Sequence, residues 1–175
     1  MKKILDKNIG ILGGTFDPPH KGHIKISKEA KKKFKLSNVF WAITKKNPFK
    51  KKTFFSLKER IEYSKKITKG NKFIKINCFE YKVKSNRTIN LIKYFKNKFK
   101  NSKIFFIMGA DNLITFHKWK NWKEIPDICQ ILVFDRDGYK TKSLKSISFK
   151  KLNKKGLKFI NFKKINISSS KLRKI

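Results

Sequence analysis

Apolar residues occur along this chain in two patterns, short continuous runs and runs spaced by three or four residues. Continuous runs predict strands that are buried on both faces, as in a parallel sheet. Residues 104–108 and 128–134 have this character, and four further stretches, residues 9–12, 38–43, 73–77 and 157–162, are also predicted to be strands. The run at 104–108 (IFFIM) is the strongest of them.

Helical spacing separates these runs. Apolar residues from Ile24 to Ala30 follow the first run at the spacing of one helix face. Residues 56–59 (SLKE) have the form of a capping box, which predicts the start of another helix. Thr88 is expected to cap a further helix, whose apolar positions continue to Phe99.

Alternating strands and helices with short connections predict an α/β fold. We expect a Rossmann-like, doubly wound parallel sheet in a single domain spanning residues 1–175. In such sheets, ligands bind beyond the carboxyl ends of the strands, where the strand order reverses. The unusual polar stretches of this chain fall at those strand ends.

Charge changes this picture only in part. The chain has 47 Lys and Arg against 11 Asp and Glu, which gives a net charge of +36. One explanation is attraction to nucleic acid or membranes, and the other is a solvated coat of lysines. We favour the coat because lysines are spread over the whole chain, so no specific nucleic-acid partner is expected. Polyanionic substrates would be attracted in either case.

The sequence also bears on compartment. No apolar run is long enough to cross a membrane. Asp6 and Lys7 interrupt the apolar start, unlike a signal peptide. Cys78 and Cys129 lie far apart in apolar surroundings and are expected to be buried, reduced thiols. These features predict a cytoplasmic enzyme without a membrane partner.

The most informative stretch is residues 13–23 (GGTFDPPHKGH), between the first strand and the following helix. Its two glycines allow a tight turn and close approach of the backbone to a ligand. A helix N-terminus offers free N–H groups and a positive dipole end to phosphate. His20 and His23 share a face there, with Thr15 and Lys21 around the same anion-sized space.

Three interpretations of this stretch compete. It could be an ordinary strand–turn–helix with surface histidines. His-x-x-His could also chelate zinc, but zinc needs further ligands, and the chain offers only His117 and two isolated cysteines. Binding of nucleotide phosphates uses every unusual residue at once, and we favour it.

The same stretch resembles the hallmark of the nucleotidyltransferase superfamily defined by the (T/H)xGH motif. Within it, the chain is most similar to the nicotinate mononucleotide adenylyltransferase family, over nearly its whole length. The resemblance implies that His20, His23, Thr15 and Lys21 carry catalysis. It implies an ATP site formed by Gly13, Gly14, Thr15, Phe16, His20, His23, Gly109, Asp111, Arg136, Ser169, Ser170 and Arg173.

Two later strand ends match this family. The stretch 109–112 (GADN) is a turn by composition, but it resembles the family's G-x-D segment, which grips a ribose hydroxyl or base. The stretch 135–139 (DRDGY) resembles R-x-G-Y, although Asp135 replaces the first of two basic residues. Arg136 is one of only four arginines in a lysine-rich chain, which indicates that a planar guanidinium is needed there.

The C-terminal stretch 167–173 (ISSSKLR) resembles the superfamily's ISSTxxR motif. By itself it could be a frayed polar tail. The resemblance implies a helical turn in which Ser169, Ser170 and Arg173 hold the β- and γ-phosphates of ATP.

The mononucleotide site is implied by three further stretches. The loop 47–51 (NPFKK) is either a solvated basic loop or a substrate loop. Thr88 matches a threonine whose backbone meets the nicotinate carboxylate, although Arg87 replaces the usual aromatic or small residue before it. Trp119 matches a tryptophan that stacks on nicotinate, a role that suits an exposed indole, and the Lys120 amide helps to hold the carboxylate. Trp122 is expected to pack in the interior.

The implied reaction joins nicotinate mononucleotide and ATP to give nicotinate adenine dinucleotide and pyrophosphate. Mg²⁺ is implied as well, held largely by ATP phosphates because the site has few carboxylates. The alternatives are a nicotinamide mononucleotide or pantetheine-phosphate adenylyltransferase and, from another class, a basic nucleic-acid-binding protein. Trp119 and Thr88 favour a pyridine substrate over a pantetheine arm.

Overall fold

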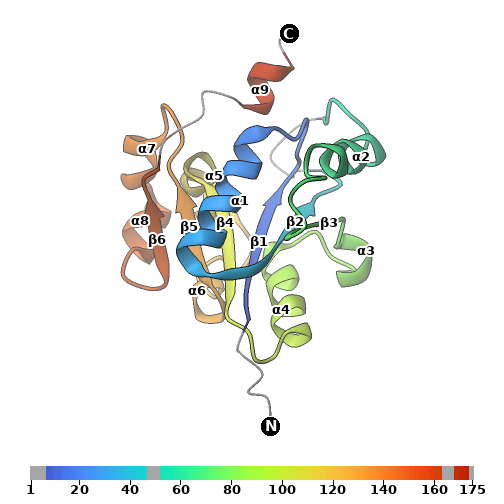
Figure 1. Cartoon of the computed structure of the whole chain (residues 1–175). Helices are drawn as coiled ribbons and strands as arrows, with labels where there is room; N and C mark the ends of the chain where they lie inside the picture. Colours follow the sequence, from blue (N-terminus) through green and yellow to red (C-terminus); the bar gives the residue numbers. More distant parts are fainter. Residues whose placement is uncertain (1–6, 47–51, 163–167, 174–175) are drawn as a thin grey trace.

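The fold is built on one six-stranded sheet, seen in the computed structural model of Figure 1. The structure describes residues 7–46, 52–162 and 168–173. All strand pairs are parallel, in the order β3-β2-β1-β4-β5-β6. The strands are β1 (Asn8–Gly14), β2 (Leu36–Ile43), β3 (Ile74–Asn77), β4 (Ile104–Gly109), β5 (Gln130–Phe134) and β6 (Leu157–Ile160).

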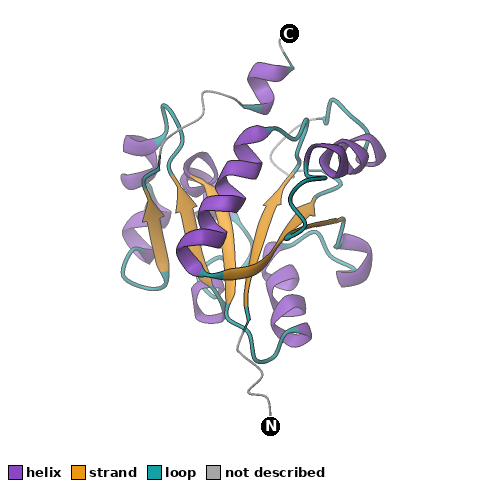
Figure 2. Ribbon diagram, in the orientation of Figure 1, coloured by secondary structure: helices purple, strands orange, loops and turns teal. Residues whose placement is uncertain are grey.

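Helices connect these strands and cover both faces of the sheet, as Figure 2 shows. The longer helices are α1 (Lys21–Phe34), α2 (Leu57–Ile67) and α4 (Thr88–Lys98). The shorter ones are α3 (Glu80–Val83), α5 (Ala110–Thr115), the 3₁₀ helix η1 (Phe116–Lys118), α6 (Ile125–Ile128), α7 (Lys140–Leu144), α8 (Ile147–Leu152) and α9 (Ser169–Leu172).

Every strand except β3 contributes residues to two separate cores, one on each face of the sheet, whereas β3 contributes to one of them. In β1, Ile11 packs with α4, α5, α6 and α8 on one face, whereas Leu12 packs with α1 and α2 on the other. This division follows from the two-residue period of a strand, since consecutive side chains point to opposite faces. The predicted α/β doubly wound fold is therefore confirmed.

The expected element bounds need three corrections. The strand predicted from residue 128 begins only at Gln130, because Ile125–Ile128 form α6 with Pro126 in its first turn. The last strand ends at Ile160 rather than at 162. Thr88 is the first residue of α4, whose cap position is Arg87, and among the described residues no side chain makes a capping hydrogen bond to that helix. The loop 47–51 lies outside the described residues.

The strand order reverses next to β1, which pairs with β2 on one side and with β4 on the other. Parallel strands leave their carboxyl ends at one edge of the sheet, so the end of β1 faces a crevice between two crossovers that run in opposite directions. Cys78 and Cys129 are buried and free, as expected. No helix in the described part of the chain is long and apolar enough to cross a membrane.

Candidate active site

The turn between β1 and α1 holds both histidines at the start of the helix. His20 is the cap residue, and its Nδ1 accepts from the Gly22 N–H at 3.1 Å. The Nδ1 of His23 accepts from the His20 N–H, also at 3.1 Å. The two ring centroids are 3.9 Å apart. This reciprocal pattern is a capping box made by two imidazoles, and it fixes both rings at the positive end of the helix.

Both imidazoles are neutral near pH 7. Burial and the nearby positive charge of Arg136 lower the pKa of His20 to about 4. Burial, His20 and Arg136 place the pKa of His23 well below its usual 6.5. Because each Nδ1 accepts a hydrogen bond, the remaining ring proton lies on Nε2 in each neutral ring. The pair can thus present two N–H donors to an anion.

We expect NMR titration of the imidazoles to find the His20 pKa near 4 and to find both pKa values raised when pyrophosphate is added. A bound anion favours the imidazolium form, which reverses the shift. Between about pH 6.5 and 4 the unfolded chain binds more protons than the folded one, so stability should fall as the pH is lowered through that window. A His20 pKa near 6.5 in the free protein would contradict this account.

A first cavity of about 310 Å³ opens over the two histidines. Nearly all residues predicted to bind ATP line it, from the ends of β1, β4 and β5, the start of α1 and the beginning of α9. These are Gly13, Gly14, Thr15, Phe16, His20, His23, Gly109, Asp111, Arg136, Ser169 and Ser170. The structure thus brings together stretches that are more than 150 residues apart in sequence.

Asp111 and Arg136 pair across this cavity, Asp111 Oδ2 accepting from Arg136 Nη1. A Cβ on Gly109 would lie 2.5 Å from Asp111 Oδ1, so a larger residue at this position would displace the carboxylate from where it now lies. Asp111 Oδ1 is buried without a partner among the described residues, and it remains an available acceptor for a ligand hydroxyl. The guanidinium of Arg136 also lies 5.6 Å from the Tyr139 ring centre.

A second cavity of about 320 Å³ lies on the other side of the turn. Thr88, Trp119 and Lys120, the residues predicted to bind the mononucleotide, all line it. It shares four lining residues with the first cavity, Gly13, Gly14, Thr15 and Asn112. Two ligands could therefore approach each other over the carboxyl end of β1.

Trp119 is less exposed than the sequence suggested. Its ring is half-buried and lies edge-on to Phe116, with centroids 5.0 Å apart, and to Phe106 at 6.2 Å. Its Nε1 is buried without a partner in the described residues. Trp122 is half-buried and edge-on to Phe116, and it packs against the core, which agrees with the packing role predicted for it.

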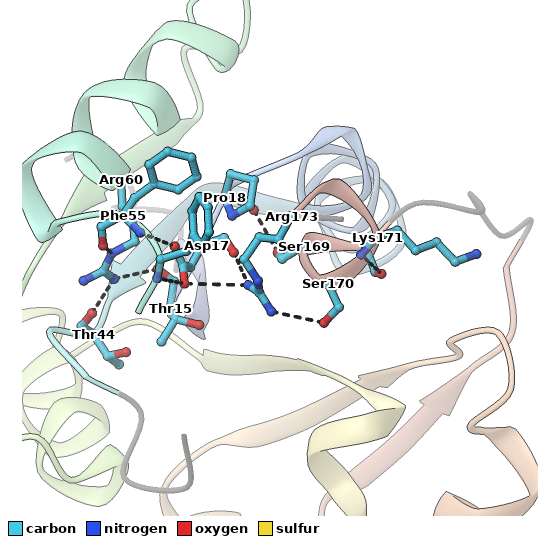
Figure 3. Close-up of polar contacts among 12 residues, drawn as sticks. Thr15, Asp17, Pro18, Thr44, Phe55, Arg60, Ser169, Ser170, Lys171 and Arg173 are labelled. Atoms are coloured by element: carbon cyan, nitrogen blue, oxygen red, sulfur yellow. Dashed lines mark hydrogen bonds and ion pairs between the residues drawn. The ribbon is translucent and has the colours of Figure 1, made fainter. Parts of the chain in front are cut away.

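Two predicted residues do not line either cavity. Lys21 is exposed at the first position of α1. Arg173 points instead toward residues 15–20, the turn between β1 and α1 that we call the signature turn. There it pairs with Asp17 Oδ2 at 3.6 Å and donates to the Asp17 carbonyl. Ser169 Oγ donates to the carbonyl of Pro18 at 2.8 Å, so the C-terminal helix is attached to that turn (Figure 3).

Sequence reasoning assigned no role to Asn112, which lines both cavities, or to two buried charged residues, Asp17 in the turn and Arg60 in α2. The rarity of arginine that singled out Arg136 applies equally to Arg60 and could have found it. In the described part of the chain, no three His, Cys, Asp or Glu side chains are grouped closely enough to hold a metal ion.

Known proteins match this chain closely. The cytidylyltransferase-like family model matches residues 11–175. A probable nicotinate-nucleotide adenylyltransferase from Pelagibacter ubique is 62% identical over 95% of this chain and 92% of the relative. Another from Ruegeria sp. is 35% identical over 74% of this chain and 68% of the relative.

A solved structure has the same fold. It is the Plasmodium falciparum nicotinic acid mononucleotide adenylyltransferase complexed with NaAD, with a TM-score of 0.73 and 23% identity over 96% of this chain and 83% of that one. The signature turn at the strand-order reversal, together with these sequence matches, decides the family. The chain belongs to the nicotinate-nucleotide adenylyltransferases, within the cytidylyltransferase-like family of nucleotidyltransferases.

Proposed function

We propose that this enzyme transfers the adenylyl group of ATP to nicotinate mononucleotide, forming nicotinate adenine dinucleotide and pyrophosphate in NAD biosynthesis. The observation that carries this proposal is the pair of cavities that meet at residues 13–15, one over the histidines and the other beside Trp119. ATP binds in the first cavity and the mononucleotide in the second.

The reaction needs no protein nucleophile. A 5′-phosphate oxygen of the mononucleotide attacks the α-phosphorus of ATP in line, and the bond from that phosphorus to the bridging oxygen of pyrophosphate breaks. Holding two polyanions in line and neutralising the charge on the leaving group accounts for catalysis.

The two neutral histidines supply Nε2–H donors to the α- and β-phosphates. The N-terminus of α1 adds its free N–H groups and dipole to the same region. Thr15 lies at the shared wall of the cavities and assists there. Lys21 assists only through its charge unless its side chain turns inward, because it is exposed in this structure.

The distal phosphates are assigned to the serines of α9 and to Arg136. Ser169 and Ser170 line the first cavity, as does Arg136. Arg173 acts in this structure as the attachment of α9 to Asp17, so its predicted contact with ATP requires that pair to open.

Mg²⁺ is proposed to arrive with ATP, bound by the phosphates and water. The described residues offer it at most the Asp111, Asp135 and Asp137 carboxylates around the first cavity, and Asp111 is already paired with Arg136. A phosphate-borne ion suits such a site because Mg²⁺ keeps several waters and needs only one or two carboxylates. When bound, it neutralises charge on the triphosphate. We also propose a cytoplasmic location.

The direct test is pyrophosphate release from Mg-ATP with a panel of acceptors: nicotinate mononucleotide, nicotinamide mononucleotide and phosphopantetheine. We expect the highest kcat/KM with nicotinate mononucleotide. Highest activity with phosphopantetheine, or none with any acceptor, would overturn the proposal. The nucleic-acid alternative predicts tight, sequence-dependent binding at physiological salt instead.

A further inference from the structure

Arg60, in the first turns of α2, is almost fully buried, with 1% of its surface exposed. Figure 3 shows its guanidinium reaching from the helix to the turn after β1 and to both ends of the connection between β2 and α2. Nη1 donates to the carbonyls of Thr15 and Thr44, each at 2.7 Å. Nη2 donates to the Lys45 carbonyl at 2.9 Å, and Nε donates to Phe55 at 3.1 Å.

Two of these four carbonyls belong to residues that line a cavity. Thr15 lines the two cavities at their junction, whereas Thr44 lines only the second. Arg60 itself lines neither. One side chain outside the site therefore ties the signature turn to the loop after β2, and so to the wall of the mononucleotide cavity.

Asp17 binds the backbone of the same connection that Arg60 binds. Its carboxylate, 5% exposed, accepts from the backbone N–H of Phe54 at 2.7 Å and of Phe55 at 2.9 Å. Phe55 is thus held at both ends, its N–H by Asp17 and its carbonyl by Arg60. The same carboxylate forms an ion pair with Arg173, at the end of α9, with 3.6 Å between Asp17 Oδ2 and Arg173 Nη1.

Phe16, which lies between Thr15 and Asp17, has an unusual backbone conformation. Phe16 has a φ of 50°, an uncommon conformation for a residue with a side chain, which persists where its surroundings enforce it. Its ring stacks on Trp41, with centroids 4.8 Å apart, and lies 4.7 Å from the His23 ring. The conformation of this turn therefore bears directly on where His23 lies.

We propose that Arg60 is a positioning residue for adenylyl transfer. It fixes the backbone of Thr15 relative to that of Thr44, so that the 5′-phosphate oxygen of the mononucleotide lies in line with the α-phosphorus of ATP. The inference rests on the proposed function. Arg60 touches neither nucleotide, so it acts on their mutual alignment more than on the affinity for either. Alignment of the attacking oxygen with the α-phosphorus is sensitive to small displacements, which can cost up to about a hundredfold in rate.

The test variant is Arg60→Lys, which keeps the charge but replaces a planar fork by one flexible ammonium. A single nitrogen cannot reach four carbonyls at once. We expect kcat per folded molecule to fall about tenfold or more, while the Kd values for ATP and for nicotinate mononucleotide, measured separately by calorimetry, change less than about threefold. Assays should run well below the melting temperature, with the folded fraction checked by circular dichroism.

Ile61→Ala is the matched control. Ile61 is the next residue of α2 and packs into the core between that helix and the sheet. Its truncation lowers stability without removing any bond to the loops. We expect it to lower the melting temperature while keeping kcat per folded molecule close to the wild-type value.

A wild-type kcat in folded Arg60→Lys would overturn the inference, as would equal losses in Arg60→Lys and Ile61→Ala. If Arg60→Lys does not fold, Asp17→Asn decides on the same readouts, because an amide donor then faces Phe54, Phe55 or Arg173 in place of an acceptor. If the wild-type enzyme itself does not use nicotinate mononucleotide, the proposed function fails rather than this assignment.

Discussion

Replacing His23 by asparagine is expected to reduce turnover about a hundredfold, while the protein still folds. The asparagine Oδ1 can take the place of Nδ1 and accept the His20 N–H, which preserves the helix cap. The shorter side chain lacks the distal Nε2–H donor that we place on the phosphates. Loss of one such transition-state contact typically costs about a hundred- to a thousandfold in kcat.

Steady-state kinetics with saturating Mg-ATP and nicotinate mononucleotide would measure this effect. His117→Ala is the control, since His117 lines neither cavity, and it should keep nearly full turnover. Thermal unfolding should distinguish the capping role of His23 from its role as a donor. His23→Ala loses both the cap and the donor and should have the lower melting temperature, whereas His23→Asn loses only the donor. Near-normal turnover of His23→Asn would remove this imidazole from the mechanism.

The centre of the sheet could be predicted from sequence because β1, β4 and β5 are buried on both faces. Apolar runs such as 104–108 have few structural alternatives when glycines and polar turns bound them. The signature stretch could be predicted for a related reason. Glycines after a strand and histidines at a helix start leave little choice of position, and the structure places the two rings together there.

Local ambiguity explains the misplaced element ends. Residues 128–134 are apolar except for Gln130, so their pattern does not separate the end of α6 from the strand that follows. Thr88 has the side chain of a good cap, but the chain enters α4 with Arg87 in the extended conformation, and Thr88 is already helical. A shift of one residue in the start of a helix lies within the range over which helix boundaries vary, and the residue types alone do not predict it.

Contacts between distant residues explain what was missed. Arg60 reaches the Thr15 carbonyl across 45 positions, and Arg173 reaches Asp17 across 156. Backbone carbonyls have no residue identity, so no motif marks a side chain that binds them, and the rarity of arginine was the one signal that pointed to Arg60. The Asp17 carboxylate was hidden for the same reason, since two of its partners are backbone N–H groups.

The second large effect is expected in the choice of substrate. The kcat/KM for nicotinate mononucleotide should exceed that for nicotinamide mononucleotide by about ten- to several-hundredfold. α4 begins at the second cavity with no side-chain cap and no acidic residue in its first turn, which leaves its backbone N–H groups to a ligand. The charged side chains around this cavity are Arg87, Lys118, Lys120 and Glu80. The Glu80 Oε1 accepts from the Lys45 N–H at 3.0 Å, so part of that carboxylate is already engaged. The net charge of the side chains around the cavity therefore favours an anionic ligand.

A carboxylate only accepts hydrogen bonds, so it suits a cluster of donors, whereas an amide turns an N–H₂ group toward one of them. Each unpaired group in a closed site costs about 1–3 kcal/mol, or roughly ten- to a few-hundredfold in kcat/KM. Kinetics with both mononucleotides at matched ATP, repeated at higher ionic strength, separate this pairing from the lysine field, because salt screens only the field. Arg87→Gln should lower the preference at low salt and have less effect at high salt. Equal kcat/KM values for the two mononucleotides would mean that the cavity does not recognise the carboxylate, and the roles given to Thr88 and Lys120 would then be wrong.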